Sequence, residues 1–262
     1  MKLLVDVHCH LDHSDLKDDL DEVLKRAQAA GVCAVITQGV NDESNKTVLE
    51  ISRKHKIVKA ALGLYPLDAV NVECEEGDES PLPKSDVDVD DTLKFIEQSK
   101  DEIIAIGEVG IDLKYSNDLK TQTENFEKII SLAKKIDKPL IVHSRSAEKE
   151  VIDILEKNSV RKVLLHCFGG GMKLVELAVD LGFYISIPAN VVRSSHFQKI
   201  VEIVPLSHLL LETDSPYLSP DPGKRNEPSN VVLGLKKIAE IKGIDEGEAE
   251  KAIYMNYQRL FF

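Results

Sequence analysis

Residues 3–10 read Leu3-Leu4-Val5-Asp6-Val7-His8-Cys9-His10, a short apolar run that ends in two histidines. The run is too short for a helix and too continuously apolar for a half-exposed strand, which is typical of a strand buried on both faces of a parallel sheet. An open doubly wound sheet usually binds its ligand at a glycine-rich turn after the first strand. This strand ends in His-Cys-His instead, so the sequence favours a different parallel architecture.

Seven further runs of the same kind follow at fairly even spacing. They are Ala34–Thr37, Val58–Leu62, Ile103–Gly107, Leu140–His143, Val163–His166, Tyr184–Ile187 and Leu209–Glu212. Between them lie amphipathic stretches in which apolar residues recur at helical spacing, as at Leu20, Val23, Leu24 and Ala27. With Leu3–His8 as the first strand, the pattern predicts eight βα units. This is an α/β fold of the (β/α)8 TIM-barrel type, for which ~250 residues is typical.

We expect a single domain over residues 1–262, with a C-terminal helix in Asp245–Phe262 packed on the barrel. One segment interrupts the alternation, because residues 73–91 contain nine carboxylates and one lysine, with Pro81 and Pro83 among them. This acidic insertion, at about residues 71–91, follows the third strand, so we expect a loop on the face where such barrels carry their active sites. A solvated insertion is favoured over a functional lid.

The chain is acidic, with 45 Asp and Glu against 33 Lys and Arg and a formal net charge of −12. Bulk electrostatics therefore argue against unspecific coating of nucleic acid or of an anionic membrane, and a phosphate-bearing substrate has to be attracted locally. No apolar run approaches the ~20 residues that a membrane helix needs. The four cysteines are widely spaced and form no CxxC pair, which favours free thiols and a cytoplasmic location.

Two histidines at the end of the first strand, His8 and His10, are candidates for a metal site. Side chains alternate along a strand, so both point the same way, while Cys9 between them points to the opposite side. Four more candidate ligands come at or just after the ends of other strands, namely Glu108, His143, His166 and Asp214. A closed barrel gathers the C-terminal ends of its strands at one rim, so we expect all six side chains to meet there.

Imidazoles and carboxylates suit zinc, manganese or magnesium, and a carboxylate can bridge two cations. Two cations about 3.5–4 Å apart can activate a water and neutralise charge on the group that is attacked. We therefore expect two divalent metal ions, whose identity the sequence leaves open. Asp214 is the candidate general base, because it can contact both metal and water. Arg145, Lys224 and Arg225 are candidate cations for binding an anionic substrate.

Six stretches in order between residues 6 and 228 resemble the TatD-type metal-dependent deoxyribonucleases of the amidohydrolase-like barrel superfamily. They are DVHCHLD (6–12), AIGEVGID (105–112), KPLIVHSR (138–145), HCFGG (166–170), LETDSPYL (211–218) and GKRNEP (223–228). The resemblance implies that His8, His10 and Asp214 hold one metal, that His143 and His166 hold the other, and that Glu108 bridges the two. It also implies cleavage of DNA phosphodiester bonds by a metal-activated water, with Asp214 and Glu108 as the catalytic residues.

The chain departs from the family's pattern around the expected substrate mouth. The family usually reads Gly-x-His-Pro after the third strand, whereas this chain reads Gly63-Leu64-Tyr65-Pro66. Tyr65 keeps a hydrogen-bonding hydroxyl at the expected phosphate contact but cannot carry a positive charge. Pro222 stands where an arginine commonly precedes Gly-Lys-Arg. Together with the acidic insertion, both changes lower the positive potential that binding of long DNA requires.

Three functions fit these residues. The motifs favour a deoxyribonuclease that acts on single-stranded or frayed DNA ends. Tyr65 and the acidic mouth favour a two-metal hydrolase of a carbonyl substrate, such as an ester, amide, lactone or aminoacyl-tRNA. A non-enzymatic metal-binding scaffold is the weakest of the three, because structural zinc sites close with four ligands and leave no open position. We expect no membrane association and no obligate protein partner.

Overall fold

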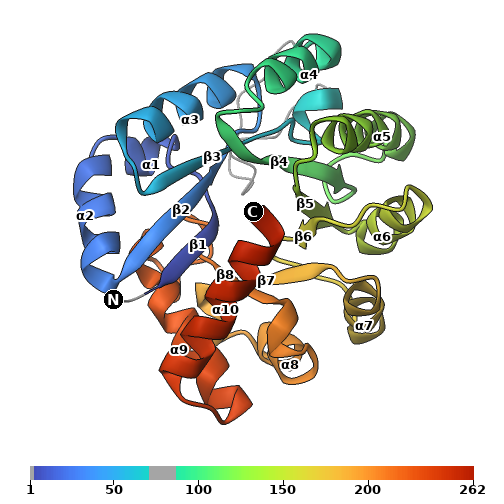
Figure 1. Ribbon diagram of the computed structural model, residues 1–262. Helices are drawn as coiled ribbons and strands as arrows, with labels where there is room; N and C mark the ends of the chain where they lie inside the picture. Colours follow the sequence, from blue (N-terminus) through green and yellow to red (C-terminus); the bar gives the residue numbers. More distant parts are fainter. Residues whose placement is uncertain (1–2, 71–86) are drawn as a thin grey trace.

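The computed structural model describes residues 3–70 and 87–262. Eight parallel strands pair in chain order from β1 to β8 and form a barrel (Figure 1). The strands are β1 (Leu4–Cys9), β2 (Val32–Gln38), β3 (Val58–Leu62), β4 (Ile103–Asp112), β5 (Leu140–Arg145), β6 (Val163–Leu165), β7 (Tyr184–Pro188) and β8 (Leu209–Glu212). The expected (β/α)8 TIM barrel is confirmed.

Two backbone hydrogen bonds close the barrel between its first and last strands. The Asp214 N–H donates to the His8 carbonyl oxygen at 2.9 Å, and the His10 N–H donates to the Ser215 carbonyl oxygen at 2.8 Å. The closure therefore joins His8 and His10 to Asp214 directly, although more than 200 residues separate them in the sequence. Two groups of candidate metal ligands are thus fixed relative to each other by the main chain.

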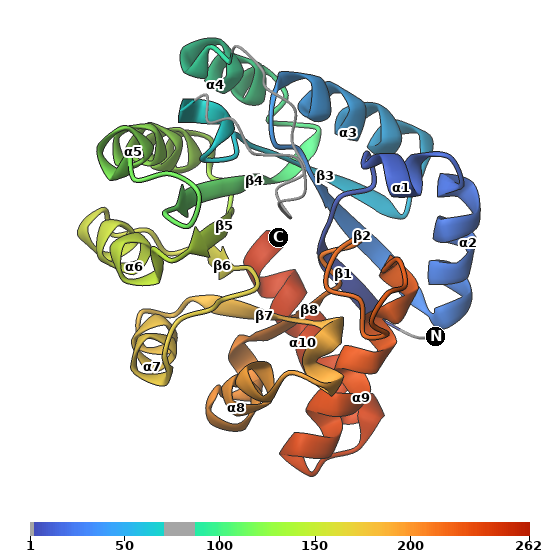
Figure 2. The same ribbon diagram turned by 180° about the vertical axis from the view of Figure 1, so that it is seen from behind.

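The helices surround the barrel, as Figures 1 and 2 show from its two ends. They are α1 (Ser14–Lys17), α2 (Leu20–Ala30), α3 (Asp42–Lys54), α4 (Val89–Gln98), α5 (Leu119–Ile136), α6 (Glu148–Lys157), α7 (Met172–Asp180), α8 (Ser195–Ile203), α9 (Val231–Lys242) and α10 (Glu246–Phe261). Short 3-10 helices are η1 (Asp68–Val70), η2 (Ala189–Val192), η3 (Leu206–His208) and η4 (Pro228–Asn230). Among the residues described, no helix is long and apolar enough to cross a membrane.

The C-terminal helix α10 lies across the end of the barrel at which the strands begin. The Asn256 side chain donates to the carbonyl oxygens of Leu206 and Leu209 just before and at the start of β8, and Glu250 accepts from the Leu3 N–H just before β1. In Figure 1, α10 crosses in front of the strands, and in Figure 2 it lies behind them. The expected C-terminal helix is confirmed, and it leaves the opposite end, where the strands finish, free for a site.

The strands are buried on both faces, as their continuous apolar runs predict. Every residue of β1, β4, β6 and β8 is buried. Val7 and Cys9 of β1 have no exposed surface, and the Cys9 thiol contacts the Ile36 carbonyl oxygen of the neighbouring strand at 3.5 Å. The helices cover the outside of the sheet with one apolar face each; in α5, for example, Phe126, Ile129 and Ile130 are buried.

The fourth strand is longer than the sequence predicts. The apolar run indicates Ile103–Gly107, whereas β4 continues to Asp112. Its pairing with β5 persists, with Gly110 opposite His143 and Asp112 opposite Arg145. Glu108 therefore lies inside the strand, and the expectation that it ends the strand is wrong. Glu108 and Asp112 interrupt the apolar pattern, and the pairing with β5 shifts its register between Ile106 and Val109 before it continues to Asp112.

The acidic segment is described only in part. Residues 71–86, with Cys74, Pro81 and Pro83, lie outside the described residues, so most of the expected loop stays a prediction. The last acidic residues belong to α4 and not to a loop. Asp88 caps this helix by accepting from the N–H groups of Asp90 and Asp91 at 2.9 and 3.0 Å, and both of these carboxylates lie in the first turn, where the helix dipole favours negative charge.

Candidate metal centre

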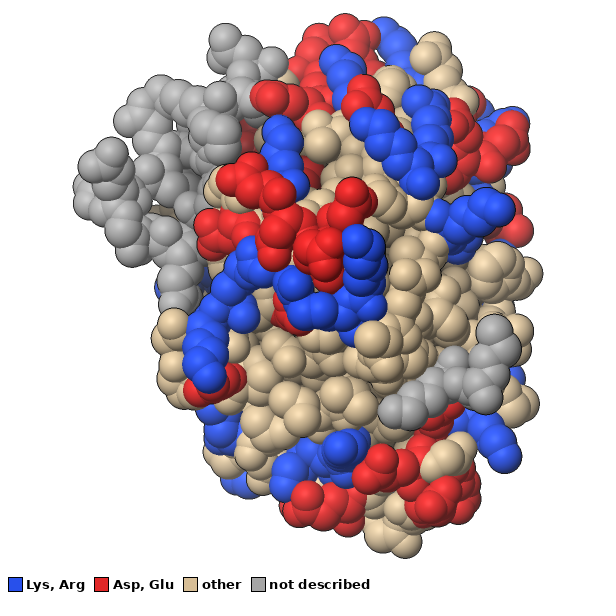
Figure 3. Space-filling model, turned by 90° about the vertical axis from the view of Figure 1, so that its left-hand side faces the viewer, with Lys and Arg blue, Asp and Glu red and all other residues tan. Residues whose placement is uncertain are grey.

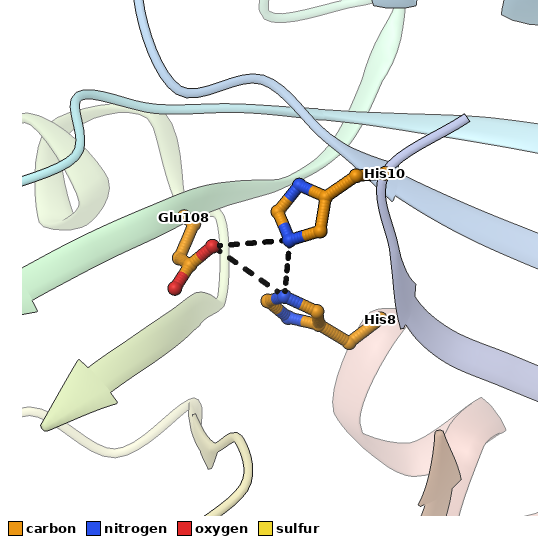
Figure 4. A group of neighbouring side chains, drawn as sticks. All are labelled: His8, His10 and Glu108. Carbon is orange, nitrogen blue, oxygen red and sulfur yellow. Dashed lines mark hydrogen bonds and ion pairs between the residues drawn. The ribbon is translucent and has the colours of Figure 1, made fainter. Parts of the chain in front are cut away.

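His8 and His10 point together into the end of the barrel where the strands finish. His8 is fully buried on β1, and its Nε2 lies 3.3 Å from Nε2 of His10 (Figure 4). The alternation of side chains along the strand puts both rings on one side, as predicted, and turns Cys9 toward β2. The two imidazoles are thus close enough to bind one metal ion together.

Glu108 stands between two pairs of histidines and offers one oxygen to each. Its Oε2 lies 3.5 Å from Nε2 of both His8 and His10 (Figure 4). Its Oε1 lies 2.9 Å from Nδ1 of His143 and 3.1 Å from Nε2 of His166. Each oxygen of the Glu108 carboxylate therefore faces a different pair of imidazoles.

Asp214 completes the group on the side of His8 and His10. Its Oδ1 lies 3.5 Å from Nε2 of His8 and 3.4 Å from Nε2 of His10. Asp214 has a left-handed backbone, with φ of 55°, which is uncommon outside glycine and is found where the surrounding structure imposes it. The preceding residue is held by Asp6, whose carboxylate accepts from the Thr213 N–H at 2.9 Å and from the Thr213 hydroxyl at 2.5 Å.

The spacing of these atoms fits divalent cations. A cation bound at ~2.0–2.1 Å in tetrahedral geometry holds its ligand atoms about 3.3–3.5 Å apart. The contacts of His8 and His10 with each other, with Glu108 and with Asp214 all lie between 3.3 and 3.5 Å. On the other side, Nδ1 of His143 and Nε2 of His166 are 3.4 Å apart, with Oε1 of Glu108 near both. Every one of the six predicted ligands therefore lies in the cluster.

Two buried carboxylates that the sequence analysis did not single out support the histidines from behind. Asp112 Oδ2 lies 3.1 Å from Nε2 of His143, the ring nitrogen that faces away from Glu108. Glu212 Oε2 lies 3.6 Å from Nδ1 of His166 and accepts from the Ser186 hydroxyl at 2.6 Å. A carboxylate at hydrogen-bond distance, as Asp112 is from His143, fixes the tautomer and orientation of a metal-binding imidazole, whereas Glu212 faces His166 Nδ1 without a hydrogen bond.

The charges of the cluster favour ionised carboxylates. Burial by itself raises the pKa of Glu108, but the neighbouring His166 and His8 hold it well below its ordinary value. Burial likewise opposes ionisation of Asp214, and the hydrogen bond from His10 brings its pKa below the usual range. Both carboxylates are therefore available as anions at neutral pH, which is the form that binds a divalent cation.

The cluster lies at the bottom of a cavity of about 530 Å³. Glu108, His10, His143, His166 and Asp214 form its floor. Its walls come from the segments after β1, β2, β3 and β8, from α1 and the start of α3, and from the end of β5. The wall residues are Asp12, His13, Ser14, Lys17, Val40, Asn41, Glu43, Ser44, Thr47, Tyr65, Arg145, Tyr217 and Leu218.

Tyr65 and Arg145, two predicted substrate contacts, both line this cavity. The Tyr65 side chain is 7% exposed, and its hydroxyl donates to Asp112 Oδ2 at 3.1 Å, the same oxygen that faces His143. Arg145 is the last residue of β5, and its guanidinium lies over the ring of Tyr115, 5.8 Å from its centre. The Arg145 guanidinium forms no ion pair with the acidic side chains that the structure describes, so it is available to an anion.

Lys224 and Arg225 are not in the cavity. Lys224 pairs with Asp221, and Arg225 pairs with Asp19 through two contacts of 2.7 and 2.9 Å. Both line a separate hollow beside the segment after β8. Both cations are therefore largely compensated by these carboxylates. Acidic and basic side chains are likewise interleaved over the side of the molecule that carries α2 (Figure 3). The sequence identifies basic residues but not the acidic partners that neutralise them.

The chain is similar over nearly its whole length to proteins of one family. A family model described as "TatD related DNase" matches residues 5–262. Deoxyribonuclease TATDN3 of Homo sapiens is 36% identical over 264 residues, which cover 98% of this chain and 94% of that protein. The uncharacterized metal-dependent hydrolase MJ1582 of Methanocaldococcus jannaschii is also 36% identical, with 98% and 96% covered. The crystal structure of the Escherichia coli TatD homologue YjjV superimposes with a TM-score of 0.84 at 27% identity, covering 98% of this chain and 97% of that one.

Proposed function

The chain belongs to the TatD-related DNase family, and we propose that it is a hydrolase that uses two divalent cations to cleave phosphodiester bonds of DNA. The observation that carries the proposal is the position of Glu108. Its two carboxylate oxygens face two different pairs of histidines at 2.9–3.5 Å. A site for a single structural cation has no need of a carboxylate shared in this way.

In this proposal His8, His10 and Asp214 hold one cation, His143 and His166 hold the other, and Glu108 is shared. When bound, the cations lower the pKa of a water and neutralise negative charge on the phosphate. The donor set accepts zinc, manganese or magnesium, and occupancy depends on which ion is available.

The chain's own residues supply the remaining steps. Asp214 directs Oδ1 toward His8 and His10, and we assign its Oδ2 the task of taking the proton of the attacking water. Arg145, unpaired among the described residues and at the cavity wall, holds a phosphate oxygen against the site. Tyr65 contributes by fixing Asp112, and through it His143.

The substrate in this proposal is DNA presented as a single strand or a frayed end. A cavity of about 530 Å³ that also contains Asp12 and Glu43 suits a chain terminus better than the rigid, densely charged duplex. The three described cysteines are free, which supports the expected cytoplasmic location. No protein partner is part of the proposal.

The test is cleavage of end-labelled single-stranded DNA by protein supplied in turn with manganese, magnesium or zinc. We expect shortening of the strand that depends on the added ion. Asp214→Asn and Glu108→Ala should abolish it, while Glu22→Gln, an exposed change on α2, should not. Absence of cleavage with all three ions would overturn the proposal.

Hydrolysis at a carbonyl carbon is the second candidate. It is favoured by Tyr65, whose uncharged hydroxyl donates to Asp112 and offers no positive charge to a phosphate. A panel of ester, amide, lactone and aminoacyl-tRNA substrates, run on the same preparation with Asp214→Asn as the blank, separates the two. Turnover of a carbonyl substrate without turnover of DNA would select this alternative.

A further inference from the structure

Two cations line the cavity among the residues that the structure describes, Arg145 and Lys17. Arg145 has a place in the proposed reaction, whereas Lys17 has none. Lys17 is exposed at the end of α1 and forms no ion pair with any described carboxylate, although Asp12 and Glu43 line the same cavity. A lysine that remains unpaired in an acidic wall is available to an anionic ligand.

Lys17 and Arg145 come from opposite sides of the barrel. Lys17 follows β1 and Arg145 ends β5, and the strand order β1 to β8 puts these two strands half a circumference apart. Figure 2 shows α1 on the face where the strands end, across the barrel from β5. The metal ligands lie between them. Because Lys17 and Arg145 approach from opposite sides, Lys17 is the candidate contact for an anionic group other than the phosphate that Arg145 holds.

The backbone of Lys17 is held in place by hydrogen bonds. The N–H groups of Leu16 and Lys17 both donate to the His13 carbonyl oxygen at 2.9 Å, and His13 Nδ1 caps the helix by accepting from the Asp15 N–H at 3.1 Å. The Leu16 side chain has no exposed surface and anchors α1 in the core. The Lys17 side chain therefore starts from a fixed backbone position beside the cavity.

The wall between the metal ligands and Lys17 suits a nucleoside. The Tyr217 ring lies edge-on to both His10 and His13, with centres 6.1 and 5.5 Å apart. The buried Tyr217 hydroxyl has no hydrogen-bond partner among the described residues. Aromatic surface beside a cation is the combination that binds single-stranded nucleic acid, through stacking and charge.

From these contacts we propose that Lys17 binds a second phosphate, one nucleotide away from the bond that is cleaved. The inference rests on the proposed function, since it assumes that the scissile phosphate lies at the metal centre. It specifies the substrate class as an oligonucleotide with at least one phosphate beyond the scissile bond. Asp12 and Glu43 repel phosphates elsewhere on the wall, which confines the second phosphate to Lys17.

The test compares three dinucleotides that share one phosphodiester bond. They are thymidylyl-thymidine and the same compound with an extra phosphate at its 5′ or at its 3′ end. For wild-type protein we expect kcat/KM to be about tenfold higher with one of the two extra phosphates, because a charge-assisted contact is gained. Lys17→Gln should remove this preference without changing cleavage of the unphosphorylated dinucleotide. Lys17→Arg should keep it.

Lys46→Gln is the matched control, because Lys46 is an exposed lysine of α3 that does not line the cavity. It should retain the preference. If neither extra phosphate raises kcat/KM, or if Lys17→Gln slows all three dinucleotides equally, the inference is wrong while the proposed function stands.

A binding measurement separates failure of the inference from failure of the proposed function. Dissociation constants of the three dinucleotides are measured with Asp214→Asn, alone and combined with Lys17→Gln. If wild-type protein cleaves none of them but binding shows a preference that depends on Lys17, the proposed function fails and the phosphate site stands. If binding shows no such preference, the phosphate site fails.

Discussion

Asp112 is not a proposed metal ligand, but its carboxylate contacts His143, which is one. Its Oδ2 lies 3.1 Å from Nε2 of His143, and Nδ1 of the same ring lies 2.9 Å from Glu108 Oε1. When Nε2 carries the proton and donates it to Asp112, Nδ1 is left with the lone pair that a cation needs.

Asp112→Asn should therefore weaken binding of one of the two cations by about 10- to 100-fold and leave the other nearly unchanged. Competition with a chelating dye measures both affinities. Asp153→Asn, the same change at an exposed carboxylate of α6, is the control and should alter neither. Two unchanged affinities in Asp112→Asn would show that Asp112 does not orient His143.

Asp68 gives the fold a pH dependence that is independent of the metal ligands. Burial raises its pKa to about 6, and the hydrogen bond from Asn41 only partly offsets this. Between about pH 4 and pH 6 the unfolded chain releases the proton before the folded chain does, so stability falls as pH rises, and the full cost is present above pH 6.

Asp68→Asn removes this ionisation and keeps an acceptor for Asn41. We expect the variant to be more stable than wild type by about 2–3 kcal/mol at pH 7–8, with the difference shrinking toward pH 4. Urea unfolding of both proteins across this range measures it. A stability difference that stays constant with pH would contradict the raised pKa of Asp68.

Individual site residues differ in how far the sequence reveals them. His8 and His10 follow from the two-residue period of a strand, which is a local property. The roles of Asp112 and Glu212 depend on which ring nitrogen each faces on a distant segment of the chain, and no local pattern carries that information. Lys224 and Arg225 are conspicuous as sequence, but pairing with Asp221 and Asp19 decides their availability.

At the scale of elements, Glu108 depends on close packing between β3 and β4. Gly63 follows β3, and a Cβ atom there would come within 2.4 Å of the Glu108 carbonyl oxygen and 2.5 Å of its amide nitrogen. These are backbone atoms that cannot move aside alone, so any side chain at Gly63 pushes β4 outward together with the shared carboxylate.

Gly63→Ala should destabilise the protein by about 1–3 kcal/mol and reduce DNA cleavage more strongly than stability alone explains. Denaturant unfolding and metal stoichiometry, measured on one preparation, separate the two effects. Gly171→Ala is the control, because a Cβ atom there meets nothing within 4 Å. A fully active Gly63→Ala protein would show that the position of Glu108 tolerates displacement.

The ion pairs of Arg225 join α2 and the segment before it to the segment before η4. Arg225 contacts Asp19, which also contacts Arg26, and Arg26 in turn contacts Glu227. Arg225→Gln should leave both kcat and KM for DNA unchanged, because its charge is already compensated outside the cavity. Arg145→Gln should raise KM in the same assay. A raised KM in Arg225→Gln would show that Arg225 contacts the substrate, as expected from the sequence.

Element boundaries were predictable where the apolar pattern and the backbone ladder coincide. Val58–Leu62 and Leu209–Glu212 are found at the predicted residues. The second half of β4 was missed because Glu108 and Asp112 interrupt the apolar run while the pairing with β5 continues. Carboxylates within a strand thus make part of that strand unrecognisable from the apolar pattern alone.

At the scale of the whole molecule, both the net charge of −12 and the positions of the basic side chains indicate that an anionic substrate is attracted locally. The chain has no general attraction for DNA, and its unpaired cavity cations are two, Arg145 and Lys17, among the described residues. Under the proposed function, affinity for DNA comes from the bound cations and from these side chains. The barrel makes this possible, because it gathers ligands from strands β1, β4, β5, β6 and β8 at one end.

The most direct test of a site built around a shared Glu108 is DNA cleavage measured against metal equivalents per chain. Metal-free protein is titrated with manganese at protein concentrations above the dissociation constants. The rate of single-stranded DNA cleavage should rise to a plateau at two equivalents per chain in wild type and stay at background in Glu108→Ala. A plateau at one equivalent, or full activity without Glu108, would contradict a two-cation site that Glu108 bridges.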